Sequence, residues 1–374
     1  MIKDTLAFIL PGLGSGGAER VVTILANRFS ENFRVVIITL YKTDPFYPLN
    51  PEIEILHCFE NAPNSKNVVE AIASNYRLLK SIAVSLKKEK VKVVIGFLTS
   101  ANVLAVLAAK LVKIPVLISE RNNPYRSNTP QFWRLLRRFT YPLADFLIVQ
   151  TNEIKKFYVG QIKSDKLVLI PNPISPELTS AKIRTEAREK IILNVGRFAD
   201  QKAQHVLIKA FAKINNDGWR LHIVGKGKRE REYQHLISSL NLEGKVVLIA
   251  PTTDIEAHYR TASIFAFVSI FEGFPNALIE AMHFSLPCIS TDCPTGPAEL
   301  IVNNKNGFLI PINDQNSLEH YLLMLMENED LRKCLGEQAQ ISVKRFEMVE
   351  IAKKWENLIS QVVSYNGNYI GEKF

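Results

Sequence analysis

The sequence of 374 residues predicts an α/β protein of two doubly wound domains, each built on a parallel sheet, and three observations support this fold class. Short apolar segments alternate with amphipathic segments along the first part of the chain. Three prolines within Pro171–Pro176 then interrupt the pattern, as a stiff connection between domains would. The alternation restarts at Ile191. We therefore expect domains of residues 1–172 and 173–349, which fits the usual domain size of about 100–200 residues.

Short apolar runs predict the strands, and segments with apolar residues three or four apart predict the helices. In the first domain, strands are expected at Leu6–Leu10, Val35–Leu40, Val91–Phe97, Val116–Ser119 and Phe146–Gln150, with helices near Ala18–Ser30, Val68–Lys88 and Ala101–Leu111. In the second, strands are expected at Ile191–Val195, Arg220–Val224, Val246–Ile249, Ile264–Val268 and Pro287–Thr291, with helices near Ala203–Ile214 and Arg229–Leu240 and a helical stretch from Leu318 to Val363.

The composition, 47% hydrophobic and 22% charged, is typical of a soluble globular protein. The apolar run at Thr5–Leu10 is short and follows an acid, so it predicts a strand rather than a signal peptide. The run Ala101–Leu117 contains two lysines and is shorter than the about 20 residues that a membrane span needs. The four cysteines form no C-x-x-C pair, which favours packing roles in a reducing cytoplasm.

A glycine loop, Gly12–Gly17, lies between the first predicted strand and helix and reads G-L-G-S-G-G. This is the context of a dinucleotide-binding loop. Such a loop also needs an acid at the end of the second strand, and Thr39–Lys42 provides none. We therefore favour a flexible loop whose amides face a cleft, before a helix N-terminus that favours a phosphate or carboxylate.

Two segments of the second domain indicate a ligand site, the first for a diphosphate and the second for ligand hydroxyls such as those of a ribose. Gly196 ends a strand and allows close backbone approach, Arg197 offers a planar set of donors, and Lys202 adds a charge near a helix start. Farther along, Glu272 lies in a strand-to-helix loop, while Glu280 lies inside an apolar helix, where an unpaired carboxylate is rare. Each group taken alone is equally consistent with ordinary surface charges.

Six motifs in chain order resemble family 4 of the glycosyltransferases, the large retaining group with the GT-B architecture. They are G-S-G-G-A-E-R at 14–20, P-N-P-I at 171–174, V-G-R-F-x-x-Q-K at 195–202, V-G-K-G-K at 224–228, F-E-G-F-P-N-A-L-I-E at 271–280 and T-G-P-A-E at 295–299. The resemblance covers nearly the whole chain. It implies two Rossmann-like domains facing a cleft, with a C-terminal helix of about 350–374 crossing back to the first.

The resemblance also implies roles for individual residues. Arg197 and Lys202 would bind the donor diphosphate, Glu280 the ribose, and Glu272 the transferred sugar. The further donor-binding positions that it implies are Gly16, Gly17, Gly196, Gly273, Phe274, Pro275 and Asn276. Because the chain contains no D-x-D pair to hold a divalent ion, we predict neither an obligatory metal nor another cofactor.

The first domain departs from the family pattern in one respect. Many members place a histidine after a mid-domain strand, whereas the only histidine in residues 1–170 is His57. The segment at that place reads S-E-R-N-N-P and resembles bacterial glycan-assembly members. Glu120, Arg121 and Asn122 are therefore candidates for contact with the acceptor or donor.

The excess positive charge lies in the first domain. Residues 1–170 hold 23 Lys and Arg against 13 Asp and Glu, whereas the rest of the chain is nearly neutral. An aromatic, leucine and arginine pattern at 132–139 suits either a helix on a membrane surface or a partly buried helix with snorkelling arginines. The candidate membrane-surface residues are Arg77, Lys80, Arg134, Arg137 and Arg138. No recognition motif supports nucleic-acid binding.

The sequence thus predicts a cytoplasmic, peripherally membrane-associated transferase. It would move a hexose or N-acetylhexosamine from a nucleotide sugar, with UDP as the favoured nucleotide, to a lipid-linked glycan at the inner leaflet. Two alternatives stay open at this point. A GT-B epimerase or glycosyl phosphorylase would act without such an acceptor, and a scaffold would bind the sugar nucleotide without catalysis.

Overall fold

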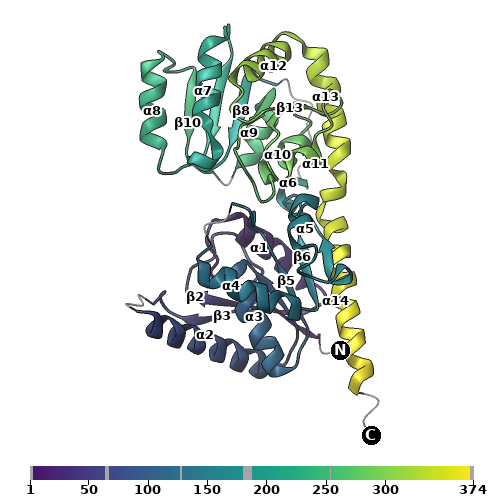
Figure 1. Cartoon of the computed structure of the whole chain (residues 1–374). Helices are drawn as coiled ribbons and strands as arrows, with labels where there is room; N and C mark the ends of the chain where they lie inside the picture. Colours follow the sequence, from purple (N-terminus) through teal and green to yellow (C-terminus); the bar gives the residue numbers. More distant parts are fainter. Residues whose placement is uncertain (1–2, 64–66, 127–128, 180–187, 253, 371–374) are drawn as a thin grey trace. The chain divides into compact units, whose positions relative to one another are not determined.

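The computed structural model describes residues 3–63, 67–126, 129–179, 188–252 and 254–370, with the side chains of Val68 and 365–370 excepted (Figure 1). Contacts divide the chain into two units. The first unit comprises Met1–Asn172 and Val349–Phe374, and the second comprises Pro173–Met348. Two parallel sheets, one in each unit, confirm the predicted fold class.

The first unit contains a seven-stranded sheet whose order is β3-β2-β1-β4-β5-β6-β7. The direction in which strands are added reverses at β1. The chain first adds β2 and β3 on one side of β1 and then adds β4 to β7 on the other side. Such a reversal opens a crevice at the carboxyl ends of the strands, where ligands of this fold class bind. The strands are β1 (Thr5–Leu10), β2 (Arg34–Tyr41), β3 (Glu54–Phe59), β4 (Val91–Phe97), β5 (Val116–Ser119), β6 (Phe146–Val149) and β7 (Leu167–Leu169).

The central strands of this sheet are buried on both faces, as expected when helices cover a parallel sheet. Apolar residues on alternate sides of β1 and β4 pack against the covering helices to form the core. The helices are α1 (Gly17–Phe29), α2 (Val68–Lys88), α3 (Thr99–Val112), α4 (Gln131–Thr140), α5 (Asn152–Tyr158) and α14 (Met348–Ile370), with 3-10 turns at Tyr141–Leu143 and Ser164–Lys166.

The second unit repeats the design with six parallel strands in the order β10-β9-β8-β11-β12-β13. These strands are β8 (Ile191–Val195), β9 (Arg220–Val224), β10 (Val246–Ile249), β11 (Ile264–Phe267), β12 (Cys288–Thr291) and β13 (Phe308–Ile310). Its helices are α6 (Pro176–Thr179), α7 (Gln204–Lys213), α8 (Glu230–Ser239), α9 (Ile255–Thr261), α10 (Asn276–His283), α11 (Pro297–Leu300), α12 (Gln315–Glu327) and α13 (Glu329–Val343), with 3-10 turns at Asp200–Lys202 and Lys344–Phe346.

Three edge strands and two helix breaks were not predicted. β3 lies at the sheet edge and its side chains are only partly buried, so its pattern is weak, while β7 and β13 have three residues each. The predicted helical stretch from Leu318 to Val363 is divided instead among α12, α13 and α14. The first division falls at Asn328, whose side chain accepts a hydrogen bond from the Leu331 N–H and so begins a new helix.

Crossing a bilayer requires a helix that is both long and strongly apolar, and none of the helices within the described ranges meets that requirement.

Candidate functional site

The sequence-predicted residues of the second unit follow the carboxyl ends of neighbouring strands. The loop at Gly196 follows β8, the loop at Gly225 follows β9, and the loop at Glu272 follows β11. β8 lies between β9 and β11 in the sheet. Because the strands are parallel, these three loops emerge at one edge, which is where a doubly wound sheet binds its ligands.

The loops after β8 and β9 pack backbone against backbone. The Gly196 N–H donates to the Val224 carbonyl at 3.0 Å, and the Phe198 N–H donates to the Lys226 carbonyl at 3.0 Å. A Cβ atom at Gly225 would overlap the Gly196 carbonyl, and one at Gly227 would overlap the Phe198 carbonyl. The glycines of the V-G-K-G-K motif are therefore required by close approach of the two loops.

Lys202 and Glu272 form an ion pair at the centre of the site. The Lys202 Nζ lies 2.6 Å from the Glu272 Oε1, and the two side chains are 16% and 7% exposed. The same ammonium lies 5.0 Å from the centre of the Phe267 ring, within reach of a cation–π contact. This environment holds the charge of Lys202 in place before any ligand arrives, which is the preorganisation that favours catalysis by fixed charges.

The loop that carries Glu272 is fixed by two further side chains. Gln201 Nε2 donates to the Phe271 carbonyl at 2.7 Å and lies 3.5 Å from the Glu272 Oε2. The hydroxyl of Thr295 donates to the Glu272 carbonyl. Thr295 adopts a φ of +69°, a left-handed conformation that is uncommon for this residue type. Sequence reasoning did not single out Gln201 or Thr295 individually, although both lie in quoted motifs.

Glu280 lies on α10 and is 4% exposed. Its Oε2 accepts a hydrogen bond from the Tyr259 hydroxyl at 3.0 Å. Tyr259 is itself fully buried on α9 and stacks on Phe284, with ring centres 5.6 Å apart. Tyr259 therefore holds the Glu280 carboxylate in one orientation. No motif pointed to this tyrosine, because the contact joins residues 21 positions apart on different helices.

On the prediction that Glu280 binds the ribose of a sugar-nucleotide donor, replacing Tyr259 with phenylalanine is expected to raise the KM for that donor about tenfold, while kcat changes less than about threefold. The variant removes one hydrogen bond to a charged group, an interaction of about 1.5–3 kcal/mol. Steady-state kinetics at varied donor concentration test this. Tyr321→Phe, on α12, is the matched control. A fall in kcat at unchanged KM would contradict this role for Tyr259.

The segment Gly273–Asn276 leads into the N-terminus of α10, with Pro275 at the position before the helix. Its neighbour is the loop at Thr295 and Gly296. A Cβ atom at Gly296, where φ is +115°, would lie 2.5 Å from the Pro275 Cδ. The buried Phe274 ring packs edge-on against Phe346. The first amides of α10 are thereby held at the same sheet edge as Glu272, and helix N-termini favour anionic groups.

Arg197 is exposed, and its guanidinium forms no ion pair within the described part of the chain. It therefore differs from Lys202, whose charge is balanced by Glu272. Gly196 and Arg197 are both held through their carbonyls by Gln204 Nε2, at 3.3 and 3.1 Å. An unpaired guanidinium on a fixed loop is suited to bind a phosphate.

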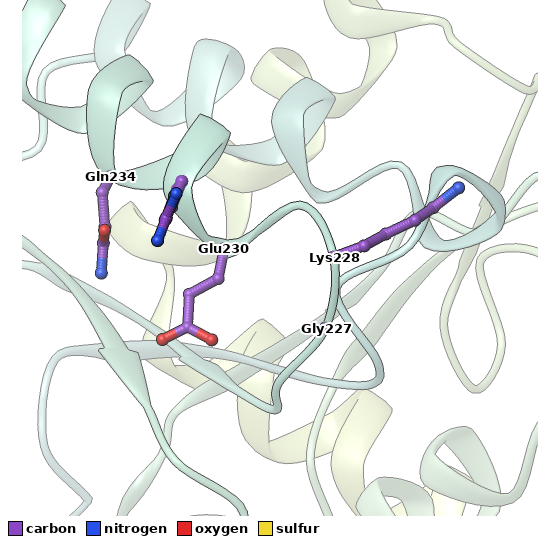
Figure 2. Close-up of a pocket in the computed structure, with 5 residues that line it drawn as sticks. Gly227, Lys228, Glu230 and Gln234 are labelled. Carbon is purple, nitrogen blue, oxygen red and sulfur yellow. The ribbon is translucent and has the colours of Figure 1, made fainter.

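A surface hollow of about 490 Å³ lies at the start of α8, beyond the Gly225–Gly227 loop (Figure 2). It contains none of Lys202, Glu272 and Glu280. Lys228, which borders it, pairs with Asp200 at 2.6 Å and so is partly neutralised. We place the candidate site at the Lys202–Glu272 pair, at the sheet edge where the three loops emerge, rather than at this hollow. The lining residues are Gly227, Lys228, Glu230, Arg231 and Gln234.

In the first unit, Gly16 precedes α1 and Gly17 begins it, as the glycine-loop interpretation requires. The Arg20 N–H donates to the Gly16 carbonyl at 3.0 Å, so the first turn is formed. A Cβ atom at Gly16 would overlap the Glu19 carboxylate. A ligand role for the amides of Gly16 and Gly17 stays a prediction.

The structure corrects the expectation for Glu120. Its carboxylate is fully buried and accepts hydrogen bonds from Thr99 at 3.1 Å and Tyr141 at 2.9 Å. Burial, followed by the nearby Glu120 charge, raises the pKa of Tyr141 well above its usual value. A carboxylate enclosed in this way braces the interior of the unit instead of contacting an acceptor. Asn122 is half-buried, donates its N–H to Glu120, and stays a candidate for contact.

Arg121 and Arg137 also differ from expectation. Arg121 is 7% exposed and lies over two aromatic rings, so it is not placed for direct contact with acceptor. Arg137 is 8% exposed and lies 5.3 Å from the Phe157 ring centre, which removes it from the membrane-surface set. The remaining members of that set, Arg77, Lys80, Arg134 and Arg138, are all exposed.

Within the ranges that the structure describes, no three His, Cys, Asp or Glu side chains come together in an arrangement that could hold a metal ion. The cationic groups of the site are supplied by Lys202 and Arg197.

Comparison with known proteins gave consistent matches. Residues 15–178 match the model of Glycosyltransferase Family 4, and residues 177–342 match that of Glycosyl transferases group 1. The crystal structure of HepE from Anabaena in complex with UDP superposes with a TM-score of 0.77 at 18% identity, covering 96% of this chain and 100% of that chain.

Two relatives from Campylobacter jejuni are each 31% identical. The first is an alpha-1,4-N-acetyl-D-galactosaminyltransferase that acts on GalNAc-alpha-(1->4)-GalNAc-alpha-(1->3)-diNAcBac-PP-undecaprenol, and the match covers 96% of this chain and 98% of that protein. The second is an N-acetylgalactosamine-N,N'-diacetylbacillosaminyl-diphospho-undecaprenol 4-alpha-N-acetylgalactosaminyltransferase, with 93% and 97% covered.

Proposed function

This chain belongs to glycosyltransferase family 4 and is a glycosyltransferase, and on that premise we propose that it transfers N-acetylgalactosamine from UDP-GalNAc to a polyprenyl-diphosphate-linked glycan. The observation that carries the donor half is the Lys202–Glu272 pair beside Arg197 at the edge of the second sheet. The sugar and the acceptor class are supported by the two Campylobacter relatives, whose names specify both.

Each charged group has a role in holding the donor. The diphosphate carries the negative charge, Arg197 and Lys202 supply cations that bind it, and the first amides of α10 add hydrogen-bond donors. Glu280 accepts hydrogen bonds from the ribose hydroxyls, in the orientation set by Tyr259. Glu272 accepts hydrogen bonds from the transferred sugar. Lys202 then lies beside both the sugar and the leaving phosphate, because its ammonium already contacts Glu272.

The proposed reaction retains the configuration of the anomeric carbon. An acceptor hydroxyl attacks that carbon from the face on which UDP leaves. The bond from the carbon to the phosphate oxygen breaks as the bond to the acceptor oxygen forms. The acceptor proton passes to the departing phosphate oxygen. Arg197 and Lys202 stabilise the charge that develops on the diphosphate, and fixed charges of this kind act most strongly in a site from which water is excluded.

The transfer assay itself tests this function. The purified protein is incubated with UDP-GalNAc and an undecaprenyl-diphosphate-linked glycan ending in GalNAc, and products are followed by mass spectrometry and NMR. We expect the glycan to grow by one N-acetylhexosamine with an α linkage. Release of UDP without glycan growth would contradict transfer to this acceptor. Epimerised donor would contradict the transferase activity, and a β-linked product would contradict retention of configuration.

We also propose that the reaction needs no divalent metal, since Lys202 and Arg197 supply the positive charge near the diphosphate. Transfer in excess EDTA is expected to proceed at more than about half of the rate measured with added Mg²⁺, because no charge-stabilising group would be removed. Initial rates in the two conditions provide the measurement, with a known metal-dependent transferase as the control. Loss of activity in EDTA that Mg²⁺ restores would overturn this proposal.

Association with an anionic membrane surface is proposed for the first unit through α4. Phe132, Leu135 and Phe139 of this helix are 45%, 59% and 64% exposed, and the exposed Arg134 and Arg138 lie among them. Apolar and cationic side chains on one exposed helix face suit the boundary between headgroups and acyl chains. A polyprenyl-linked acceptor lies in such a membrane.

Replacing Arg134 and Arg138 together with glutamine is expected to weaken binding to vesicles of phosphatidylglycerol and phosphatidylethanolamine by about 30-fold, since each arginine near an anionic surface contributes about 1 kcal/mol. Co-sedimentation at low salt measures the partition. The matched control replaces two exposed cations of the second unit, Arg231→Gln with Lys305→Gln. Equal weakening in both double variants would show that net charge, not α4, governs binding.

A further inference from the structure

The chain passes between the two units twice, and one buried arginine contacts both segments on the first-unit side. The passages occur between Asn172 and Pro173 and between Met348 and Val349. Arg121, which lies just beyond β5, contacts Asn172 at the first passage. It also contacts Trp355, two turns into α14 from the second passage. All of these contacting residues belong to the first unit.

At the first passage the contact is a shared hydrogen bond. Arg121 Nη1 donates to the Asn172 Oδ1, and Gln150 Nε2 donates to the same oxygen at 2.7 Å. Asn172 is 3% exposed, and Pro173 follows it immediately. The residue before a proline is confined to extended backbone. The last residue of the first unit is therefore fixed in both its side chain and its backbone.

At the second passage the contact is a stack of rings. The Arg121 guanidinium carbon lies 5.1 Å from the Phe97 ring centre and 5.9 Å from that of Trp355. Phe97 and Trp355 stack on each other at 6.0 Å with an interplanar angle of 22°. Both rings are fully buried. The arginine thereby attaches α14 to the carboxyl end of β4.

The contacts of Arg121 with the two rings and with Asn172 require a charged, planar guanidinium. Burial lowers its pKa to about 9, an effect that the neighbouring Glu120 opposes, and the guanidinium forms no salt bridge with any carboxylate in the described ranges. Its Nε and Nη2 have no protein acceptor there. A buried cation without a salt-bridged carboxylate depends for compensation on the ring faces, the Asn172 oxygen and the more distant charge of Glu120. Lysine cannot reproduce a planar group that stacks and donates at once.

We propose that Arg121 is a positioning residue that fixes the directions in which both connections leave the first unit, and so limits how the two units reorient during the transfer cycle. Hinges in two-domain proteins consist of a few residues at loop or element ends, and here both connections are anchored by one side chain. The part of this inference that concerns turnover rests on the proposed function, whereas the part that concerns hinge stiffness does not.

The test measures the distance distribution between the units by single-molecule energy transfer, without ligand and with UDP. One label is attached to the native, exposed Cys334 on α13, and the other to α2 through Ala73→Cys, in a chain carrying Cys58→Ser. In Arg121→Met, we expect the ligand-free distribution to broaden at least twofold. We expect kcat with UDP-GalNAc to fall at least tenfold and the Kd for UDP to stay within twofold. Arg121→Lys should not restore kcat.

Controls separate hinge stiffness from loss of folding. Arg126→Met removes an exposed arginine from the same segment and should match the unsubstituted protein. If Arg121→Met does not fold, Trp355→Phe weakens the α14 contact alone and should broaden the distribution to a smaller extent. An unbroadened distribution in the folded variant overturns the inference. Failure of the unsubstituted protein to bind UDP contradicts the proposed function instead, and the ligand-free distributions still decide the role of Arg121.

Discussion

Lys202→Met is expected to lower kcat for glycosyl transfer by about 10²–10³-fold, the effect typical of removing one preorganised group that stabilises transition-state charge. Methionine keeps an unbranched apolar side chain of similar length and removes the ammonium that lies over the Phe267 ring. The measurement is single-turnover transfer at saturating donor. Lys209→Met, an exposed lysine on α7, is the matched control and should keep its kcat within twofold.

The same substitution leaves the Glu272 carboxylate, 7% exposed, without its cation. Breaking a buried pair in this way commonly costs about 3–5 kcal/mol, so a lower melting temperature is expected as well. The double variant Lys202→Met with Glu272→Gln removes both charges. It should recover most of the lost stability, while its kcat stays far below that of Glu272→Gln alone. A kcat equal to that of Glu272→Gln alone, together with recovered stability, would show that Lys202 acts only through folding.

Glu272→Gln is expected to lower kcat/KM for the sugar donor by about 10²-fold while binding of UDP alone stays unchanged or becomes tighter. The glutamine keeps the shape and loses the charge that accepts hydrogen bonds from the sugar, and hydrogen bonds to charged groups are about twice as strong as neutral ones. UDP carries no sugar and does not need this contact. Loss of the carboxylate also frees the Lys202 ammonium, now 2.6 Å from it, to bind the diphosphate.

Isothermal titration with UDP and with UDP-GalNAc, together with steady-state kinetics, separates the effect on nucleotide binding from the effect on sugar binding. Glu319→Gln, on α12, serves as the charge-matched control. If UDP binding fell in parallel with kcat/KM, Glu272 would be holding the nucleotide or the loop rather than the sugar, and its proposed role would be wrong.

The fold was largely predictable because the strands that build the two sheet centres are short apolar runs with little ambiguity. β4 and β5 were predicted at the residues where the structure has them. The strands that escaped prediction lie at sheet edges, where partial burial in β3 and a length of three residues in β7 and β13 leave too little pattern. Sheet order needs contacts between distant segments, and a single sequence does not contain them.

In the candidate site, some residues could be predicted from the sequence and others could not. Glu280 was named because a carboxylate inside an apolar helix is conspicuous in the sequence itself, whereas Glu272 and Lys202 were named for their places in a loop and at a helix start, within motifs that resemble those of the family. Tyr259 and Thr295 were not singled out, because their importance arises only from which carboxylate or carbonyl they contact in the fold.

For some charged residues of the first unit, prediction from the sequence was wrong. Glu120 was assigned to a contact surface through a family resemblance and Arg137 through the charge pattern, yet both are buried. Three hydroxyls enclose the first, and two aromatic rings cover the second. Sequence alone does not distinguish a charged group that faces a ligand from one whose partners come from distant segments.

The most direct test of the central claim, a UDP-sugar site built on Lys202 and Glu272, is a comparison of thermal stabilisation by UDP-GalNAc in the unsubstituted protein and in Lys202→Met. At about 100 times its dissociation constant the donor should stabilise the unsubstituted protein by about 2.7 kcal/mol. We predict that this stabilisation is lost in the variant at the same donor concentration. Equal stabilisation of both proteins, or none in the unsubstituted protein, would contradict the claim.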